Sequence, residues 1–399
     1  MSRSRLIEML RHSIDHAKAG TLEQEPDVYR VPAANYVDEE RWRQEMDAVF
    51  RRVPLVLATT AELRDPGSYK SLTVMGVPVL ISRTAGGELR AFVNMCSHRG
   101  SVIMPEGSGR ARRFICPYHA WAYDDEGALV GILSSGDFGE VDRSCLGLTA
   151  LPVAERAGLV WVHLDPKATL DIDTFLCGYD EMLEHFGFAD WHVVSQRQVE
   201  GPNWKIAYDG YLDLYHLPIL HKDTFGPNFP NQAHYYAWGP HQRVSSPHPG
   251  LAALDGRPEE EFPDAVLMGG VWTIFPHVSI ATFDAGGPGV LLSQLFPGKT
   301  PRESVTVQTY LMSQEPDDEQ RALALKQVEL LEYVVREEDY ATGLRQQGAL
   351  ATGVLDEVLF GRNEGGGHRF HRWVERLIEA RGEDLGPLFE AGEDAIRPR

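Results

Sequence analysis

Two short segments, CSHRG beginning at residue 96 and CPYHAWAYDDEG beginning at residue 116, decide how the first half of this chain folds. Each segment offers one thiol and one imidazole: Cys96 with His98, and Cys116 with His119. Both segments follow short β-rich runs separated by turn residues, a pattern typical of strands joined by loops. The spacing therefore predicts two neighbouring loops that present four metal ligands.

Two kinds of metal centre combine two cysteines with two histidines. One is a tetrahedral Zn²⁺ site, but zinc modules usually pair Cys with Cys at a gap of roughly two to four residues, which neither segment does. The pattern C-x-H followed by C-x2-H on two β-loops is instead that of a Rieske [2Fe–2S] centre, in which two imidazoles replace two thiolates and raise the cluster potential. A third interpretation is that the four residues are incidental buried side chains.

The composition excludes several classes of protein. The chain has 399 residues, and its 38 Lys and Arg against 58 Asp and Glu give a formal charge of −20, which repels nucleic acids and anionic lipid surfaces. It contains no run of about 18 apolar residues of the kind that spans a membrane. Its four cysteines are too few for a disulfide scaffold. We therefore expect a folded cytoplasmic protein of about two domains that binds neither nucleic acid nor membrane.

The hydrophobic pattern divides the chain into three regions. Residues 1–52 contain two amphipathic lead-in helices, the second of them starting after Asp38 as N-cap. Residues 53–166 predict a compact all-β module. Residues 167–399 mix long helices with strands, which predicts an α+β layer on an antiparallel sheet. Expected in this last region are helices over 171–187, from Asn203, over 317–347 and over 368–381, strands near 192–200, 233–240, 270–283, 289–296 and 303–313, and long loops over 245–265 and 345–367.

A second constellation lies downstream, where His216 and His221 stand five residues apart. On a continuous helix this spacing rotates the two side chains by about 140°, but Pro218 disfavours a regular helix there, so His221 can turn back. Asp213 shares a helical face with His216 and can orient it or relay through it. Two histidines and a carboxylate form the facial triad of non-haem Fe(II) oxygenases. Taken alone, the spacing fits two surface or core histidines better.

The combination of CSHRG, CPYHAWAYDDEG, NWK, DLYH and a following His resembles the catalytic alpha subunit of Rieske non-haem iron ring-hydroxylating oxygenases, over most of the chain. The resemblance implies an all-β Rieske domain followed by a helix-grip (START/SRPBCC-like) catalytic domain with an antiparallel sheet and long helices. It also implies that Cys96 and Cys116 bind one cluster iron and that His98 and His119 bind the other.

For the second metal, the resemblance implies a mononuclear Fe(II) bound by His216, His221 and an acidic residue on the long helix. That residue matches Asp339 in REEDYATGLRQQG. The adjacent Glu337 and Glu338 are the alternatives, and a plain solvated helix face is another interpretation of this acidic run.

The sequence departs from the family pattern at two positions. Gly210 follows Asp209 where many members carry Asn, which removes an amide near the iron, and His277 replaces the usual Asn of an FPN-like segment. His277 either lines the pocket or is an ordinary buried histidine. Five aromatic side chains could shape an apolar substrate cavity or could equally belong to the core: Tyr235, Tyr236, Trp238, Trp272 and Phe275.

By resemblance, we expect the terminal component of a multicomponent Rieske oxygenase that uses O₂ to hydroxylate an apolar, aromatic substrate once or twice. O- or N-demethylation is the alternative outcome. Electrons should come from an NAD(P)H-dependent reductase, a ferredoxin or both, since no G-x-G-x-x-G follows a strand. The other classes considered are an electron carrier without the second iron and a zinc-stabilised binding protein.

The resemblance further implies an assembly. In the family, a head-to-tail homotrimer, in some members with a small beta subunit, places the cluster of one subunit beside the iron of the next. Asp213 would then join His216 to His119 of the partner subunit, whereas in the plainer interpretation it only orients His216.

Overall fold

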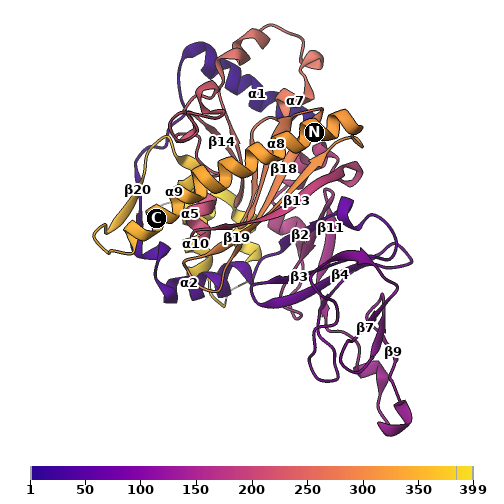
Figure 1. The fold of residues 1–399 in the computed structure, drawn as a ribbon. Coiled ribbons are helices and arrows are strands. Elements are labelled where there is room, and N and C mark those ends of the chain that lie inside the picture. The colour runs from indigo at the N-terminus through magenta and orange to yellow at the C-terminus, as the bar shows by residue number, and fades with distance from the viewer. Residues whose placement is uncertain (1, 383, 398–399) are drawn as a thin grey trace. The chain divides into compact units, whose positions relative to one another are not determined.

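The computed structural model describes residues 2–382 and 384–397, in two compact units (Figure 1). One unit is Arg51–Ile172, and the other combines Met1–Phe50 with Asp173–Arg399. The lead-in helices thus belong to the same unit as the C-terminal half of the chain. In the part of the chain that the structure describes, no helix has the length and apolar character needed to cross a membrane.

The smaller unit consists of three antiparallel sheets with strand orders β10-β5-β4-β3-β6, β11-β12-β2 and β7-β8-β9. The β3–β4 hairpin turns through Met75 and Gly76, both with positive φ, as a tight two-residue hairpin requires. The all-β prediction is confirmed. The strands are β2 (Leu55–Thr59), β3 (Ser68–Val74), β4 (Val77–Arg83), β5 (Leu89–Val93), β6 (Gly107–Arg110), β7 (Arg113–Ile115), β8 (Ala122–Asp124), β9 (Leu129–Gly131), β10 (Ala150–Leu151), β11 (Val153–Arg156) and β12 (Leu159–Val162).

The larger unit contains a seven-stranded antiparallel sheet of order β13-β19-β18-β17-β16-β15-β14. Strand β18 is buried along nearly its whole length, as its apolar sequence VLLSQLFP requires. The α+β prediction with an antiparallel sheet is confirmed. The strands are β13 (His192–Gly201), β14 (His234–Trp238), β15 (His241–Ser245), β16 (Val271–Ile274), β17 (Val278–Asp284), β18 (Pro288–Pro297) and β19 (Ser304–Met312).

A long helix crosses this sheet (Figure 1). Helix α8 (Asp318–Tyr333) starts at Asp317, whose carboxylate accepts the backbone N–H of Gln320 at 2.9 Å. Its apolar stripe of Ala324, Val328 and Leu331 packs on strand residues of the sheet. The helix continues through a π-helical segment, Val334–Tyr340, into α9 (Ala341–Leu350). The helix predicted over 317–347 is therefore present, but its register changes in the middle.

Two sequence-based boundaries are wrong. The helix predicted over 171–187 breaks into α3 (Ile172–Leu176) and α4 (Asp180–Leu183), because Cys177 and Gly178 both have positive φ. The segment 345–367 is not one long loop: α9 runs to Leu350, and β20 (Glu357–Phe360) pairs with β1 (Tyr29–Pro32). The loop predicted over 245–265 is present, with only short 3₁₀ turns at Pro249–Leu254 and Glu259–Glu261 between β15 and α7 (Asp264–Leu267).

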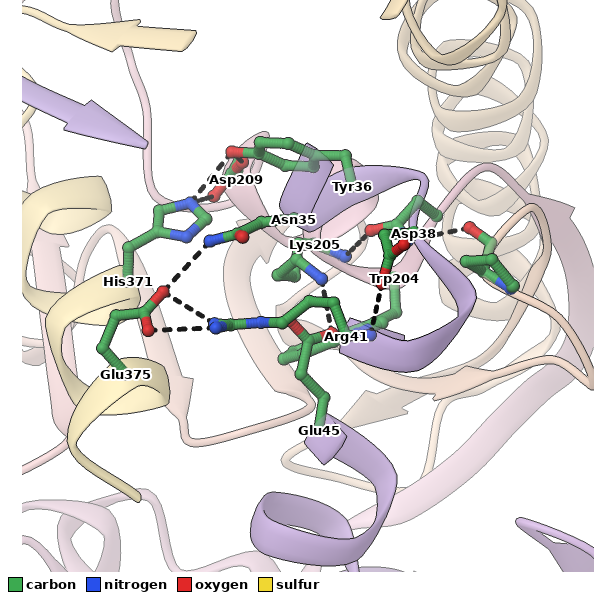
Figure 2. Close-up of polar contacts among 12 residues, drawn as sticks. Asn35, Tyr36, Asp38, Arg41, Glu45, Trp204, Lys205, Asp209, His371 and Glu375 are labelled. Carbon is green, nitrogen blue, oxygen red and sulfur yellow. Dashed lines mark hydrogen bonds and ion pairs between the residues drawn. The ribbon is translucent and has the colours of Figure 1, made fainter. Parts of the chain in front are cut away.

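A buried ionic network fastens the lead-in region to the catalytic half of the larger unit (Figure 2). Helix α2 (Glu39–Glu45) starts at the predicted N-cap Asp38 and ends at Glu45, which is completely buried. The Glu45 carboxylate binds the ammonium of Lys205 and accepts the indole N–H of Trp204 at 2.9 Å. Both partners lie on α5 (Trp204–Asp209), the short helix that precedes the histidine motif. This contact therefore holds in place the chain segment that leads into the site.

Candidate metal centres

The two Cys–His segments of the smaller unit fold into matching loops. In the first, the N–H of Gly100 donates to the carbonyl of Cys96 at 2.9 Å, and in the second the N–H of Ala120 donates to the carbonyl of Cys116 at 3.0 Å. Gly100 and Ala120 both have positive φ, which closes each loop tightly. Each loop thus turns its Cys and its His in the same way, so the four side chains gather at one end of the unit.

The four side chains form an inner pair and an outer pair. The thiols of Cys96 and Cys116 are buried, whereas His98 and His119 are half-buried with ring centroids 4.7 Å apart. Burial alone would raise the pKa of Cys116, but hydrogen bonds from the backbone N–H groups of Tyr118 and His119 and from Cys96 bring that pKa below its usual value. Stabilised thiolates inside and imidazoles at the rim fit a [2Fe–2S] cluster with two sulfur and two nitrogen ligands.

Neighbouring rings fix this end of the unit. The indole of Trp121 stacks on the His98 ring at 4.8 Å, and the Tyr123 hydroxyl lies 3.2 Å from the sulfur of Cys96. A hydroxyl at that distance can donate to a thiolate, an interaction of the kind that tunes cluster potentials. Tyr123 is a site residue that was not predicted from the sequence, although it follows Cys116 by seven residues and lies on strand β8.

In the larger unit, His216 and His221 bracket a single helical turn, α6 (Leu217–Leu220). Pro218 lies in the first turn of α6, where its missing N–H is one of those without an intrahelical partner anyway. The prediction that no regular helix runs through both histidines is thus right, but Pro218 begins a helix rather than preventing one. The two rings end up 5.1 Å apart, and His221 is buried.

The structure brings Asp339 to the two histidines. Its Oδ1 lies 3.2 Å from Nε2 of His221 and 3.7 Å from Nε2 of His216. One donor atom from each of the three residues lies within 4.8 Å of the others. Asp339 lies in the π-helical segment of the long helix, and such segments occur frequently at functional sites.

Each histidine is held from behind by its own carboxylate. Nδ1 of His216 lies 3.0 Å from Asp213, and Nδ1 of His221 lies 2.6 Å from Glu338, which also accepts the Thr224 hydroxyl at 3.1 Å. Burial would lower the pKa of His221, but Asp339 and Glu338 raise it above its ordinary value. Both imidazoles therefore direct Nε2 at Asp339. This donor set of two nitrogens and one oxygen, with the imidazoles oriented by carboxylates, fits Fe(II).

Glu338 was the alternative to Asp339 as a metal ligand, but it does not lie in a ligand position. The structure places it behind His221 rather than beside the Nε2 atoms. The adjacent Glu337 is half-exposed and pairs with Arg336 at 2.7 Å, away from both histidines. The acidic run is thus divided among three surroundings, which sequence periodicity alone could not assign.

Comparisons with known proteins agree with this geometry. Residues 53–137 match the family model described as Rieske [2Fe-2S] domain, and residues 188–380 match the one described as ring hydroxylating alpha subunit (catalytic domain). The chain belongs to the Rieske oxygenase alpha subunits. The cofactors of this family are a Rieske [2Fe–2S] cluster and a mononuclear non-haem iron, as the sequence analysis predicted.

Several curated Rieske oxygenases are similar to the chain. The anthranilate 1,2-dioxygenase large subunit of Acinetobacter baylyi is 30% identical over 201 residues, 49% of this chain and 43% of that protein. The carnitine monooxygenase oxygenase subunit of Acinetobacter baumannii is 31% identical over 201 residues, covering 49% and 54%. The glycine betaine monooxygenase oxygenase subunit of Pseudomonas aeruginosa is 29% identical over 212 residues, covering 52% and 48%. The matches thus span about half the length of these relatives.

Solved Rieske oxygenases share the fold. A quaternary ammonium Rieske monooxygenase in complex with L-carnitine superposes with a TM-score of 0.74 at 22% identity, covering 88% of this chain and 96% of that one. Naphthalene 1,2-dioxygenase from Rhodococcus sp. bound to indole gives a TM-score of 0.72 at 20% identity, covering 96% and 100%. The predicted fold, a Rieske domain with an antiparallel α+β catalytic domain, is confirmed.

In this Rieske oxygenase, His216 and Asp339 line a cavity of about 280 Å³. Three further carboxylates line it, from Asp209, Asp213 and Glu364, together with Tyr211, Tyr340 and Phe360. Asp209 is engaged at 2.9 Å by the hydroxyl of Tyr36 and at 2.9 Å by Nε2 of His371 (Figure 2). The wall of this cavity therefore combines several carboxylates with apolar side chains.

The aromatic side chains considered for an apolar cavity do not line this one. Trp238, Trp272 and Phe275 are buried, and Trp272 lies under the Arg243 guanidinium at 4.5 Å. The hydroxyls of Tyr235 and Tyr236 bond backbone carbonyls. The core interpretation fits all five better than the cavity interpretation.

The two departures from the family pattern have different surroundings. Gly210 lines the cavity, and a Cβ there would meet only the carbonyl of Ala207 at 3.6 Å, so the glycine leaves room beside Asp209. His277 is completely buried, its ring lies 5.0 Å from that of Phe296, and burial lowers its pKa to about 3. His277 is not among the residues that line this cavity.

Proposed function

We propose that this chain is the terminal oxygenase component of a multicomponent Rieske system. In this proposal Cys96, Cys116, His98 and His119 hold the cluster, and Fe(II) is bound by His216, His221 and Asp339. The observation that carries it is the convergence of both Nε2 atoms on Asp339, with both Nδ1 atoms already engaged by carboxylates. An electron carrier without the second iron has no need for this arrangement.

A bound Fe(II) would supply open coordination positions for reaction of O₂ with substrate. The chain's own residues keep those positions usable. Glu338 and Asp213 hold Nδ1 of His221 and of His216, which orients both rings with Nε2 toward Asp339. Burial of His221 and Glu338 excludes water from one side, while the cavity admits small molecules from the side of His216. Electrons come from an NAD(P)H-dependent reductase, a ferredoxin or both.

We propose that electrons pass between subunits of a head-to-tail trimer. The half-buried cluster histidines stand among exposed apolar side chains, such as Met95 and Tyr118. Around His216 the larger unit also exposes apolar side chains, at Tyr215 and Ile219. Surfaces of this kind are typical of interfaces, and two unlike surfaces on one chain fit a closed ring of copies. Asp213, which lines the cavity and bonds Nδ1 of His216, is then the bridge to His119 of the partner subunit.

For the substrate, we propose a small quaternary ammonium compound rather than the apolar aromatic compound expected from the sequence. Burial, together with the nearby carboxylates of Asp213 and Asp209, raises the pKa of Glu364. A cation in the cavity would relieve this repulsion, and the aromatic rings there suit a cationic headgroup. The names of the carnitine and glycine betaine monooxygenase relatives agree with this class. The anthranilate dioxygenase relative supports an aromatic acid as the second candidate.

Metal and acid-labile sulfide analysis of the purified chain tests the two centres. Cluster iron and sulfide plus one further iron per chain are expected. Cluster iron alone would indicate an electron carrier, and zinc without sulfide a zinc-binding protein.

Substrate-dependent O₂ uptake with a surrogate reductase tests the substrate class. A trimethylammonium compound should be turned over, and its uncharged tert-butyl isostere should not. Glu364→Gln should raise KM for the cation more than it lowers kcat, whereas Glu357→Gln, on the exposed side of β20, is the matched control. Equal turnover of the neutral isostere, or preference for anthranilate, would contradict the quaternary ammonium proposal.

A further inference from the structure

Three histidines that belong to neither of the sites described above lie close together. His12 and His16 lie four residues apart on α1 (Ser2–Ala19) and so share one face of that helix, and His234 begins β14. The ring centroid of His16 lies 4.6 Å from that of His12 and 4.6 Å from that of His234. The centroids of His12 and His234 lie 5.0 Å apart. One ring nitrogen of each lies within 4.8 Å of the others. We call these residues the three-histidine cluster.

Two rings of the cluster are oriented from behind. The Tyr236 hydroxyl lies 2.9 Å from the carbonyl of Met9, to which it donates, so it accepts from Nδ1–H of His12 at 3.0 Å. The Thr21 hydroxyl lies 2.9 Å from Nδ1 of His16. In both rings Nδ1 is therefore engaged and Nε2 is left as the donor atom. Metal-binding histidines are typically held in this way by a partner on the other ring nitrogen.

The third ring has no such partner. His234 is completely buried, and neither of its ring nitrogens has a hydrogen-bond partner. The nearest carboxylate, that of Glu23, lies 3.9 Å from its Nδ1. A buried imidazole with both nitrogens unsatisfied is rare in folded proteins. Burial first, and then the neighbouring His12 and His16, lower the pKa of His234 to about 4, so that it stays in the neutral form that metals bind.

We propose that the three-histidine cluster binds one Zn²⁺, which fastens α1 to β14. Three imidazoles are a recurrent zinc donor set, and they leave the fourth position of a tetrahedral ion to water or another ligand. The ion satisfies the buried nitrogen of His234 and adds a strong link between the N-terminal helix and an edge strand of the sheet. This site is independent of the iron and cluster sites, so it stands or falls separately from the proposed oxygenase activity.

The test uses the full chain, loaded with iron and cluster. Zn²⁺ is added, loosely bound metal is removed by gel filtration, and zinc is counted by mass spectrometry. One zinc per chain is expected, with three nitrogen scatterers at about 2.0 Å in zinc X-ray absorption. His12→Ala and His16→Ala should each weaken zinc binding at least about 100-fold, and Thr21→Val about 10-fold, since loss of an orienting partner costs less than loss of a ligand.

Two control variants test whether zinc binding depends on the three-histidine cluster and not on other histidines. His192→Ala removes a half-buried histidine on β13 and should leave zinc binding unchanged. His216→Ala should also retain the zinc, which separates this site from the iron site. Because His12 and His16 are half-buried, their variants should fold, as circular dichroism would show. No zinc retained by the unmodified chain, or equal zinc in His16→Ala, would overturn the proposal.

Discussion

Replacing Lys205 by Met should destabilise the larger unit. Lys205 and Glu45 are both completely buried, and their charged groups are bonded to each other (Figure 2). Burial lowers the pKa of Lys205, and the adjacent Glu45 opposes that effect. Lys205→Met keeps the volume and removes the charge. It leaves the Glu45 carboxylate buried with only Arg41 at 2.8 Å and Trp204 at 2.9 Å.

The size of the effect follows from what Glu45 loses. Removing one partner of a buried ion pair costs about 3–5 kcal/mol, because a buried charge is left uncompensated. Since Arg41 still pairs with Glu45, we expect the lower end, a loss of about 3 kcal/mol in the free energy of unfolding. The double variant Glu45→Gln with Lys205→Met removes both charges and should recover at least about half of that loss, because replacing both members of a pair is far less costly.

Urea denaturation can follow the two units separately. Visible absorbance of the Rieske cluster reports the smaller unit, and far-ultraviolet circular dichroism reports the helices of the larger one. Lys70→Met is the matched control, since Lys70 pairs with Glu62 at 2.6 Å and both are nearly buried, but in the smaller unit. It should shift the cluster transition and leave the helical transition in place. If Lys205→Met costs less than about 1 kcal/mol, or if the double variant is less stable than the single one, the ionic contact does not anchor the lead-in region.

Further predictions concern the iron ligands and their partners. Asp339→Ala should lose the mononuclear iron and turnover while the cluster spectrum stays, as metal analysis and electron paramagnetic resonance would show; an active Asp339→Ala enzyme would exclude it as a ligand. Glu338→Gln should weaken iron binding about 10–100-fold, measured by equilibrium dialysis. Asp213→Asn should keep the iron yet nearly abolish cluster-to-iron electron transfer in stopped-flow single turnovers, whereas rapid cluster oxidation would refute the bridge. Burial lowers the pKa of His241 from about 6.5 to about 4, so the folded state binds fewer protons than the unfolded state, and stability should fall by up to about 3 kcal/mol as the pH drops from about 6.5 to about 4. His241→Gln should flatten that part of the pH–stability curve, and an unchanged slope would contradict the assignment.

The metal motifs could be predicted because their geometry is local. Cys96 and His98 share one loop, and Cys116 and His119 share another, so the spacing itself fixes which side chains stand together. Asp213 and His216 also lie close together, but the prediction that they share a helical face is wrong, because α5 ends at Asp209 and both residues lie in the irregular segment before α6. The contact between His221 and Glu338 joins residues 117 positions apart and depends on how the long helix crosses the sheet. No periodicity in the sequence carries that information.

The aromatic side chains illustrate a different limit. Strand periodicity indicates which residues share a face of the sheet, but it does not indicate what covers that face. Trp238 and Trp272 are packed against Tyr179, which lies 59 and 93 residues earlier in the chain, and so they are core. The pairing of β1 with β20 was missed for the same reason, since it joins opposite ends of the chain.

The two histidine–carboxylate contacts of the iron site look alike but are placed differently, and this difference explains why Asp213 and Glu338 should fail in different ways. The Glu338 side chain is 12% exposed and also accepts the Thr224 hydroxyl, so it is fixed inside the protein and can act only through His221. Asp213 is 23% exposed and lines the cavity; its second oxygen accepts the backbone N–H of Tyr215, and its exposed face leaves acceptor capacity for a further partner. A carboxylate whose only task is to orient a ring gains nothing from exposure, because water competes for its hydrogen bonds. The exposure of Asp213 is therefore what a bridge to an external redox group requires, and the burial of Glu338 is what a purely orienting residue requires.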